Sequence, residues 1–251
     1  MIKFFRKIRQ RLLSENKFSK YLIYAIGEIV LVVIGILIAL SINNWNEENK
    51  ESNKVKSLLV ALKNDLAQDT LLINENLPEV KKQLNLNESL RARVANPDAT
   101  IDTLIKIVRF EFNPNWDNPV LYNTNAYNSL VETDLIEQLT DSMKLKIKNF
   151  YNQKFYLNGM VKDITQDYRS KIRSYVDTYT FGSTSLHDQG KLIDSIVWSK
   201  IDLQDLAAKF QGMSNFKRIV FRLSKNDLEY SMENSKKLIG ELDKYIDENN
   251  N

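Results

Sequence analysis

Few side chains in this sequence have the types and spacing that acid–base or nucleophilic chemistry needs. His187 is the only histidine, and it stands beside Asp188, so the two could form an acid–base pair. A lone His–Asp pair in a polar stretch is more often exposed structure than a catalytic dyad. The chain has no cysteine, no glycine-rich phosphate loop and no serine in a nucleophile-elbow context. Carboxylates are abundant, but nothing singles out the two that a glycosidase would use. We therefore expect no enzymatic activity, no catalytic residue, no metal site and no cofactor.

One carboxylate stands in an unusual setting, because Glu28 interrupts the apolar run AIGEIVLVVIGILIAL at residues 25–40. At about 100° per residue on a helix, four residues form one narrow stripe: Glu28, Val32, Gly35 and Ala39. Gly35 and Ala39 make a small-xxx-small pair that lets another backbone approach closely, and a polar group on the same stripe can reach across that contact. The stripe predicts a helix–helix contact with a second copy or another membrane protein. A proton or ion path through Glu28, and a protonated side chain near the membrane interface, are the alternatives.

The apolar run is long enough to cross a bilayer. Residues 21–42 make about 33 Å of helix at roughly 1.5 Å per residue, and a hydrocarbon core is about 30 Å thick. Basic residues precede the run and NNWNEEN follows it, so the positive-inside rule predicts a cytoplasmic N-terminus. We expect an inner (cytoplasmic) membrane protein with a periplasmic C-terminal domain. A cleaved signal peptide with the site Ala39-Leu40-Ser41 is the alternative, but the long basic region and the glutamate argue against it.

The positive charge of the chain is concentrated at its start. The net charge is +3, residues 1–20 contribute +6, and the rest of the chain therefore sums to −3. The bulk of the protein is thus not expected to bind nucleic acid. In residues 1–17, apolar side chains recur at helical spacing between basic ones, which favours an amphipathic helix lying on the inner leaflet of the bilayer. A solvated tail that only sets the topology is the alternative. The predicted membrane-surface residues are Lys3, Arg6, Lys7, Arg9 and Arg11.

An aromatic-rich stretch, FEFNPNWDNPV at residues 110–120, is the most unusual candidate surface in the rest of the chain. Its prolines and asparagines predict a structured loop. Clustered aromatic side chains could line a ligand or partner site, or they could plug the end of a helical bundle. The residues concerned are Phe110, Phe112, Trp116 and Tyr122.

The helix after the membrane carries a heptad-like apolar seam that is interrupted by a gap at Asp69. The seam is made by Val55, Leu59, Leu62, Leu66, Ile73, Leu77, Val80 and Leu84. We expect Pro78 to kink or break this helix near Leu77, and NPD at residues 96–98 to end it.

Helical periodicity continues to the end of the chain, and glycine and proline are scarce. We expect a short helix over residues 100–109 capped by Thr100, one starting near Thr124, and a short one capped by Thr133 or Asp134. Longer helices are predicted over residues 140–180 and 214–249, with a shorter piece at 191–211. The predicted fold is all-α, a transmembrane helix that continues into an up-and-down bundle. The predicted domains are residues 1–17, 18–45 and 46–251.

The N-terminal sequence MIKFFRKIRQ…ENKFSKYLIYAIGEIVLVVIGILIALSINNWNE resembles the opening of a widespread group of uncharacterised single-pass membrane proteins of the Bacteroidota. The Gly-Glu pair, the later glycine and the NNWNE exit carry the resemblance. The segment NTNAYNSLVETDLIEQLTDSMKLKIKNFYN at residues 123–152 is similar to the middle of the same group, although Val131-Glu132-Thr133 replaces its small turn residues. The resemblance implies the membrane topology and implies no activity.

Three functions are compatible with these patterns. The first is a non-enzymatic scaffold or interaction subunit, whose partners are the lipid bilayer and itself or another membrane protein. The second is a periplasmic sensor or regulatory subunit that couples ligand binding to a membrane partner. The third, which the sequence favours least, is a cell-wall enzyme.

Overall fold

The predicted all-α fold is confirmed. The computed structural model describes residues 18–116, 118–179 and 190–248, and these ranges contain helices and connecting loops but no strand. The chain divides into two compact units, Met1–Ser57 and Leu58–Asn251. The domain boundaries predicted at residues 17 and 45 refer to positions in a membrane, and they stay a prediction.

Helix α2 runs from Phe18 to Ala95 and contributes to both units. Within the first unit it is apolar and long enough to cross a membrane, and no residue of its most apolar window is buried. Large side chains such as Leu31 and Leu37 are more than half exposed. A helix that is apolar on all sides is stable only inside a protein core or a membrane. This stretch is therefore compatible with a single-pass membrane protein.

Within the second unit, α2 buries the predicted seam. Leu62, Leu66 and Ile73 are completely buried, and Leu77 and Leu84 pack at the edge of the same core. The helix continues through Pro78, so of the predicted kink or break the break is wrong, and the kink stays a prediction. Burial of apolar side chains on both sides of the proline offsets the cost of its missing hydrogen bond, about 3 kcal/mol. The helix ends at Ala95, directly before the predicted stop signal.

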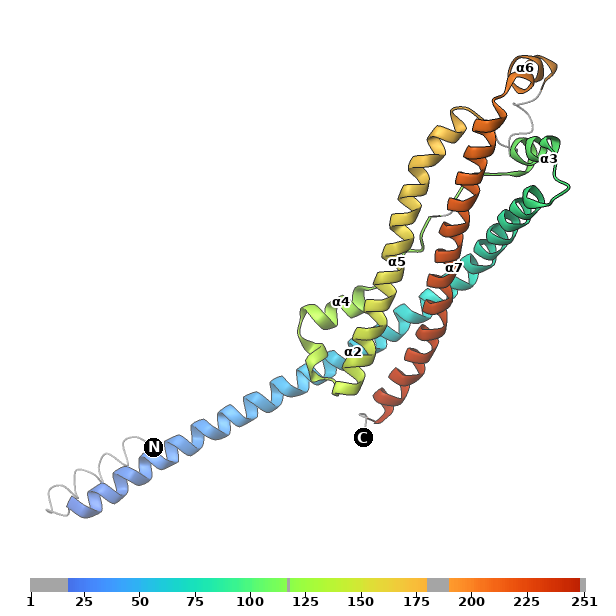
Figure 1. The fold of residues 1–251 in the computed structure, drawn as a ribbon. Coiled ribbons are helices and arrows are strands. Elements are labelled where there is room, and N and C mark those ends of the chain that lie inside the picture. Colours follow the sequence, from blue (N-terminus) through green and yellow to red (C-terminus); the bar gives the residue numbers. More distant parts are fainter. Residues whose placement is uncertain (1–17, 117, 180–189, 249–251) are drawn as a thin grey trace. The chain divides into compact units, whose positions relative to one another are not determined.

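Two further long helices complete the bundle of the second unit (Figure 1). They are α5 (Asp141–Val176) and α7 (Leu203–Glu248). Near one end of the bundle, Lys63 of α2 pairs with Asp243 of α7 at 2.7 Å. Near the other end, Asn87 of α2 donates a hydrogen bond to the carbonyl of Ser214. Helix α7 is therefore antiparallel to α2, and it is also antiparallel to α5.

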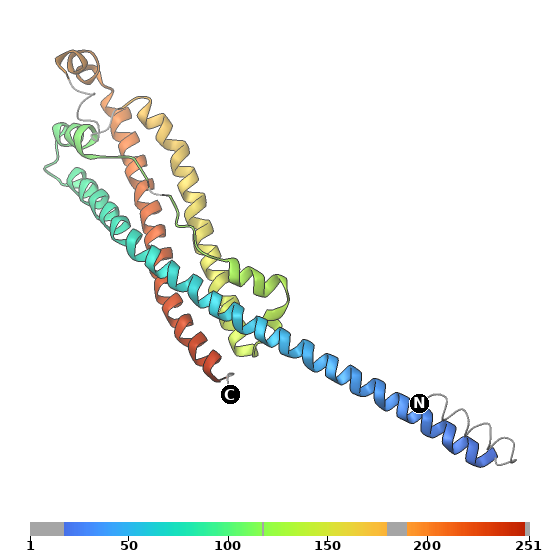
Figure 2. The same cartoon turned by 180° about the vertical axis from the view of Figure 1, so that it is seen from behind.

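Because α2 and α5 run in the same direction, the chain must return along the bundle between them. Figures 1 and 2 show this return as a thin, largely extended segment that leads from α3 at one end to α4 at the other. The second limb of the up-and-down order is thus irregular rather than a long helix. Its regular elements are α3 (Ile101–Lys106), the π-helix η1 (Ile107–Glu111), α4 (Asn125–Glu132) and the 3-10 helix η2 (Leu135–Gln138).

Side-chain caps explain where several of these helices begin. Thr100 caps α3, as predicted, and the structure adds a reciprocal capping box with Thr103. Helix α4 begins after Thr124, but its cap comes from another element, because Asp65 of α2 accepts a hydrogen bond from the amide of Ala126. Of the two caps predicted for the next short helix, Thr133 or Asp134, the structure places Asp134 at the N-cap position. Asp134 precedes η2 in a left-handed conformation (φ 56°) without a side-chain capping bond.

The C-terminal helix begins earlier than predicted. The expected piece at residues 191–211 is split into α6 (Lys191–Ile196), the 3-10 turn η3 (Trp198–Lys200) and the start of α7 at Leu203. Helix α7 then continues through Gly212. A glycine inside a helix costs only about 1 kcal/mol, and Phe210 and Met213 on either side of it are buried.

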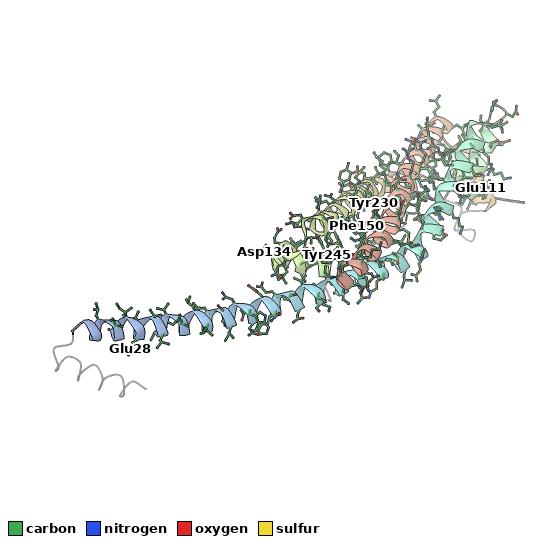
Figure 3. All side chains as sticks on the ribbon, turned by 90° about the horizontal axis from the view of Figure 1, so that it is seen from below. Glu28, Glu111, Asp134, Phe150, Tyr230 and Tyr245 are labelled. Atoms are coloured by element: carbon green, nitrogen blue, oxygen red, sulfur yellow. The ribbon has the colours of Figure 1, made fainter. Side chains whose placement is uncertain are left out.

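The bundle core contains two clusters of buried apolar side chains. One lies towards α3 and includes aromatic residues from the return segment, α5 and α7, such as Phe112, Tyr168 and Phe210. The other centres on Ile73, Val80, Phe221 and Leu228. Aromatic contacts extend the packing between α5 and α7, for example the stacked rings of Phe150 and Tyr230 (Figure 3).

Candidate functional site

The four residues of the predicted membrane stripe lie on one continuous helix. Glu28, Val32, Gly35 and Ala39 all belong to α2, and Glu28 is labelled in Figure 3. Val32 is 57% exposed, and a Cβ built on Gly35 would meet no atom within 4 Å. The small residues of the stripe therefore leave room for a second backbone. That a partner helix occupies this room stays a prediction.

Two other predicted sites fall outside the described residues. The membrane-surface set Lys3, Arg6, Lys7, Arg9 and Arg11 precedes the first described residue, Phe18, and the His187–Asp188 pair lies within residues 180–189. The predictions made for both groups therefore stay as predictions.

The aromatic loop is largely a plug, which was one of the two alternatives that the sequence left open. Phe112 is 1% exposed and packs edge-on against the rings of Tyr175 and Phe210. Trp116 packs on the same cluster. Tyr122 is part of the second cluster. Phe112 is therefore a buried plug, and Trp116 and Tyr122 are partly buried against the bundle core. That this loop also lines a ligand or partner site stays a prediction.

Phe110 alone among the four predicted aromatic residues remains on the surface. It is 52% exposed in the π-helix η1, with the guanidinium of Arg109 5.0 Å from its ring centre. Arg109 also lies over the ring of Trp198 and pairs with Asp194 of α6. These contacts hold η1 against the α6–η3 segment.

The most unusual arrangement in the second unit is a buried ion pair that was not predicted from the sequence. Asp69 of α2 and Lys154 of α5 are both completely buried, and their charged atoms lie 2.6 Å apart. The second carboxylate oxygen of Asp69 accepts hydrogen bonds from the backbone and side-chain nitrogens of Asn123. Asp69 therefore ties three segments together: α2, α5 and the return segment.

Aromatic rings surround the charge of Lys154. Its ammonium lies 4.2 Å from the ring centre of Tyr122, and the rings of Phe150 and Tyr151 are within 5.5 Å. Burial lowers the pKa of Lys154, and the attraction of Asp69 opposes that shift. The pairing with a carboxylate and the ring faces compensate for part of the lost hydration.

A second buried carboxylate, Asp227 of α7, lies close to this pair. One of its oxygens accepts hydrogen bonds from the Tyr122 hydroxyl at 3.1 Å and from the Asn158 amide at 3.4 Å. Its other oxygen, Oδ1, makes no hydrogen bond to any described residue. The Ser231 hydroxyl adjoins this carboxylate and acts on its pKa as a hydrogen-bond donor. Burial raises the pKa of Asp227, and hydrogen bonds from Asn158 and Tyr122 and the charge of Lys154 oppose that shift.

The sequence held a signal for this polar cluster, defined here as Asp69, Tyr122, Lys154, Asn158 and Asp227. Asp69 stands at the gap of the heptad seam, where an apolar residue would otherwise be buried. Lys154 and Asn158 continue the buried stripe of Phe150 at four-residue spacing. A polar residue at a core position of one helix predicts a polar partner at a core position of another.

The lysine of the cluster is fully buried. No group of three or more acidic, histidine or cysteine side chains among the described residues could hold a metal ion. The predicted absence of a catalytic residue stays a prediction. What the cluster does hold is one carboxylate oxygen, Asp227 Oδ1, that still has the capacity to accept a hydrogen bond.

Comparisons with known proteins place the chain at the level of a family. Neither the curated proteins nor the solved structures contain a match. A family model described as "Family of unknown function" (DUF6090) matches residues 28–196. The matched range begins at Glu28 and includes the rest of the stripe, the aromatic loop and both members of the buried ion pair. Since it spans well over half of the chain, this protein belongs to the DUF6090 family.

Proposed function

We propose that this protein is a non-enzymatic interaction subunit of a membrane complex. It crosses the inner membrane once, with residues 1–17 in the cytoplasm and the helical bundle in the periplasm. The N-terminal basic residues and the acidic NNWNEEN exit support this orientation through the positive-inside rule. The Bacteroidota resemblance of the N-terminal sequence agrees with a periplasmic bundle.

One observation carries the proposed assembly role, namely the stripe of small residues on the apolar part of α2. Lipid tails are as apolar as leucine, so transmembrane helices associate through close backbone packing and not through the hydrophobic effect. Gly35 and Ala39 stand one turn apart on one face, with open space at Gly35. A second copy of the same helix is the simplest partner for such a face.

The chain has no cysteine, so a single introduced cysteine is the only thiol that can form a disulfide crosslink. Val32→Cys places a thiol on the stripe, and Val30→Cys places one about 160° away on the same helix. With the full chain in membranes, mild oxidation should give a disulfide-linked dimer for Val32→Cys and little for Val30→Cys. Adding Gly35→Leu to Val32→Cys should reduce the dimer several-fold, because a bulky side chain separates the backbones. Gly27→Leu, about 80° from Gly35, is the matched control and should leave the dimer unchanged.

Equal crosslinking at positions 30 and 32, or a dimer that Gly35→Leu leaves unchanged, would contradict self-assembly through the stripe. The orientation is tested separately with an alkaline phosphatase fused to the C-terminus, which folds to an active enzyme only outside the cytoplasm. An inactive fusion would overturn the proposed topology.

A second candidate function is a regulatory subunit whose bundle binds a ligand. The observation that favours it is a pocket in the second unit to which the buried Asp227 contributes. A bundle used only for scaffolding gains nothing from a buried carboxylate with unused hydrogen-bonding capacity. The chemistry of that pocket defines the ligand class more closely.

A further inference from the structure

The bundle contains a pocket of about 280 Å³ between α2, the return segment, α5 and α7. At about 30 Å³ for each water in the liquid, this volume corresponds to roughly nine water molecules. The pocket is therefore the size of a small metabolite or a short aliphatic chain. All of its lining residues belong to the second unit.

The charged groups that line the pocket are all acidic. Glu75 and Glu79 lie on exposed positions of α2, and Asp227 is buried in α7. No lysine or arginine appears in the lining formed by the described residues. Lys82 and Gln83 donate hydrogen bonds to Glu79, whereas Glu75 forms no ion pair within the described part of the chain. The lining carries three carboxylates, of which Glu79 is paired with Lys82 and Asp227 lies near Lys154, so the negative charge of the pocket is only partly compensated and favours a cation.

Asp227 supplies an independent reason to expect a ligand. Its side chain is 2% exposed, and Oδ1 makes no hydrogen bond within the described residues, where the Ser231 hydroxyl is the neighbouring donor. A buried acceptor without a donor costs free energy, more so when it is charged. A ligand that brings a donor into the pocket would remove that cost. Because an ionised carboxylate only accepts hydrogen bonds, the missing group must be a donor.

The three carboxylates of the pocket lie apart from one another, which favours an organic cation over a metal ion as the ligand. The described acidic side chains do not converge closely enough to ligate one ion. Between the buried carboxylate and the two exposed ones, the lining is partly apolar and includes Val80 and Val161. A hydrocarbon chain fits such a wall, and an ammonium group at each end fits the carboxylates.

We propose that the pocket binds an aliphatic diamine or polyamine, with one ammonium on Asp227 and another at Glu75 and Glu79. This ligand class deepens the second candidate function. It does not depend on the assembly of the transmembrane stripe, which is measured by crosslinking without ligand. Failure of one proposal therefore leaves the other intact.

Calorimetric titration of the full chain in detergent tests the site with a matched pair of probes. Hexamethylenediamine should bind saturably, and hexamethylene glycol, which has the same length but no charge, should not. Asp227→Asn should weaken diamine binding about tenfold or more, because a hydrogen bond to a charged group is lost. Glu75→Gln should weaken it roughly threefold, since that carboxylate is exposed. Glu132→Gln, an equal change of charge at an exposed position outside the pocket, should bind as the wild type does.

The proposal is overturned if the folded chain shows no saturable diamine binding. It is also overturned if Asp227→Asn and Glu75→Gln bind the diamine as tightly as Glu132→Gln. Should Asp227→Asn fail to fold, the double variant Glu75→Gln/Glu79→Gln, at two exposed positions, decides the question. A loss of binding in that variant supports the site, and unchanged binding contradicts it.

Discussion

Two stretches of helix α2 both carry large aliphatic side chains, but these side chains have very different surroundings. In the first unit, Leu37 is 56% exposed, and in the second unit, Leu62 is completely buried. Each stretch also contains one acid in an apolar context. Glu28 lies on a stripe with open space at Gly35, whereas Asp69 is buried against Lys154 and Asn123.

The difference shows that an acidic residue within an apolar segment has a different role in each unit. Around Asp69, the chain supplies every neighbour itself, so the acid fixes how α2, α5 and the return segment pack. Around the stripe, the apolar side chains have no cover within the described residues of the first unit. They require lipid or another chain, and substitutions in the two stretches should therefore have different consequences.

The largest effect is expected from breaking the buried ion pair. Lys154→Met leaves Asp69 buried without its cation, which should lower the free energy of unfolding by about 3–5 kcal/mol. Urea denaturation of the full chain in a mild detergent measures this loss. The double variant Asp69→Asn/Lys154→Met should recover part of it, because the amide oxygen can still accept from Asn123. Glu28→Gln should leave the stability of the bundle unchanged, and a comparable loss there would invalidate the contrast.

Truncating one leucine in each stretch sharpens the comparison with a matched change. Leu62→Ala creates a cavity in the core and should cost about 2–5 kcal/mol. Leu37→Ala removes the same atoms from an exposed position and should not change the denaturation midpoint of the bundle. If both variants lost the same stability, the two stretches would share one folded core, contrary to the division into units.

The smallest effect concerns pH and separates Asp227 from Asp69, which has a lysine partner. Burial raises the pKa of Asp227 above its ordinary value of 3.8. The folded chain thus keeps this proton where the unfolded chain has lost it, and stability falls as the pH rises from about 4 through the raised pKa. An asparagine side chain does not titrate, so the stability of the Asp227→Asn variant relative to wild type should increase between about pH 4 and pH 7. Asp98→Asn, at an exposed position, is the control; an equal trend there would refute the assignment.

Local signals in the sequence were sufficient for the fold class, the seam of α2, its end before residue 96, and the cap at Thr100. Each depends on neighbours in the chain, such as side-chain spacing or a short capping motif. The partner of Asp69 could not be identified in this way. The chain has 35 lysine and arginine residues, and only the packing of α5 against α2 selects Lys154. The same limit applies to Phe112, whose burial depends on the path of the return segment.

Pro78 has a mechanical consequence for the wall of the pocket. Proline has no amide hydrogen, so the carbonyl of Asn74, four residues earlier, receives no helical bond from it. Glu75 and Glu79 line the pocket. On α2 they stand on either side of the position where this backbone hydrogen bond is missing. One side of the pocket is therefore a turn of α2 that lacks one backbone hydrogen bond. The buried side chains of Ile73 and Val80 stabilise this turn. Bending there costs less than in the neighbouring turns, so the width of the pocket can change while the rest of the bundle stays packed.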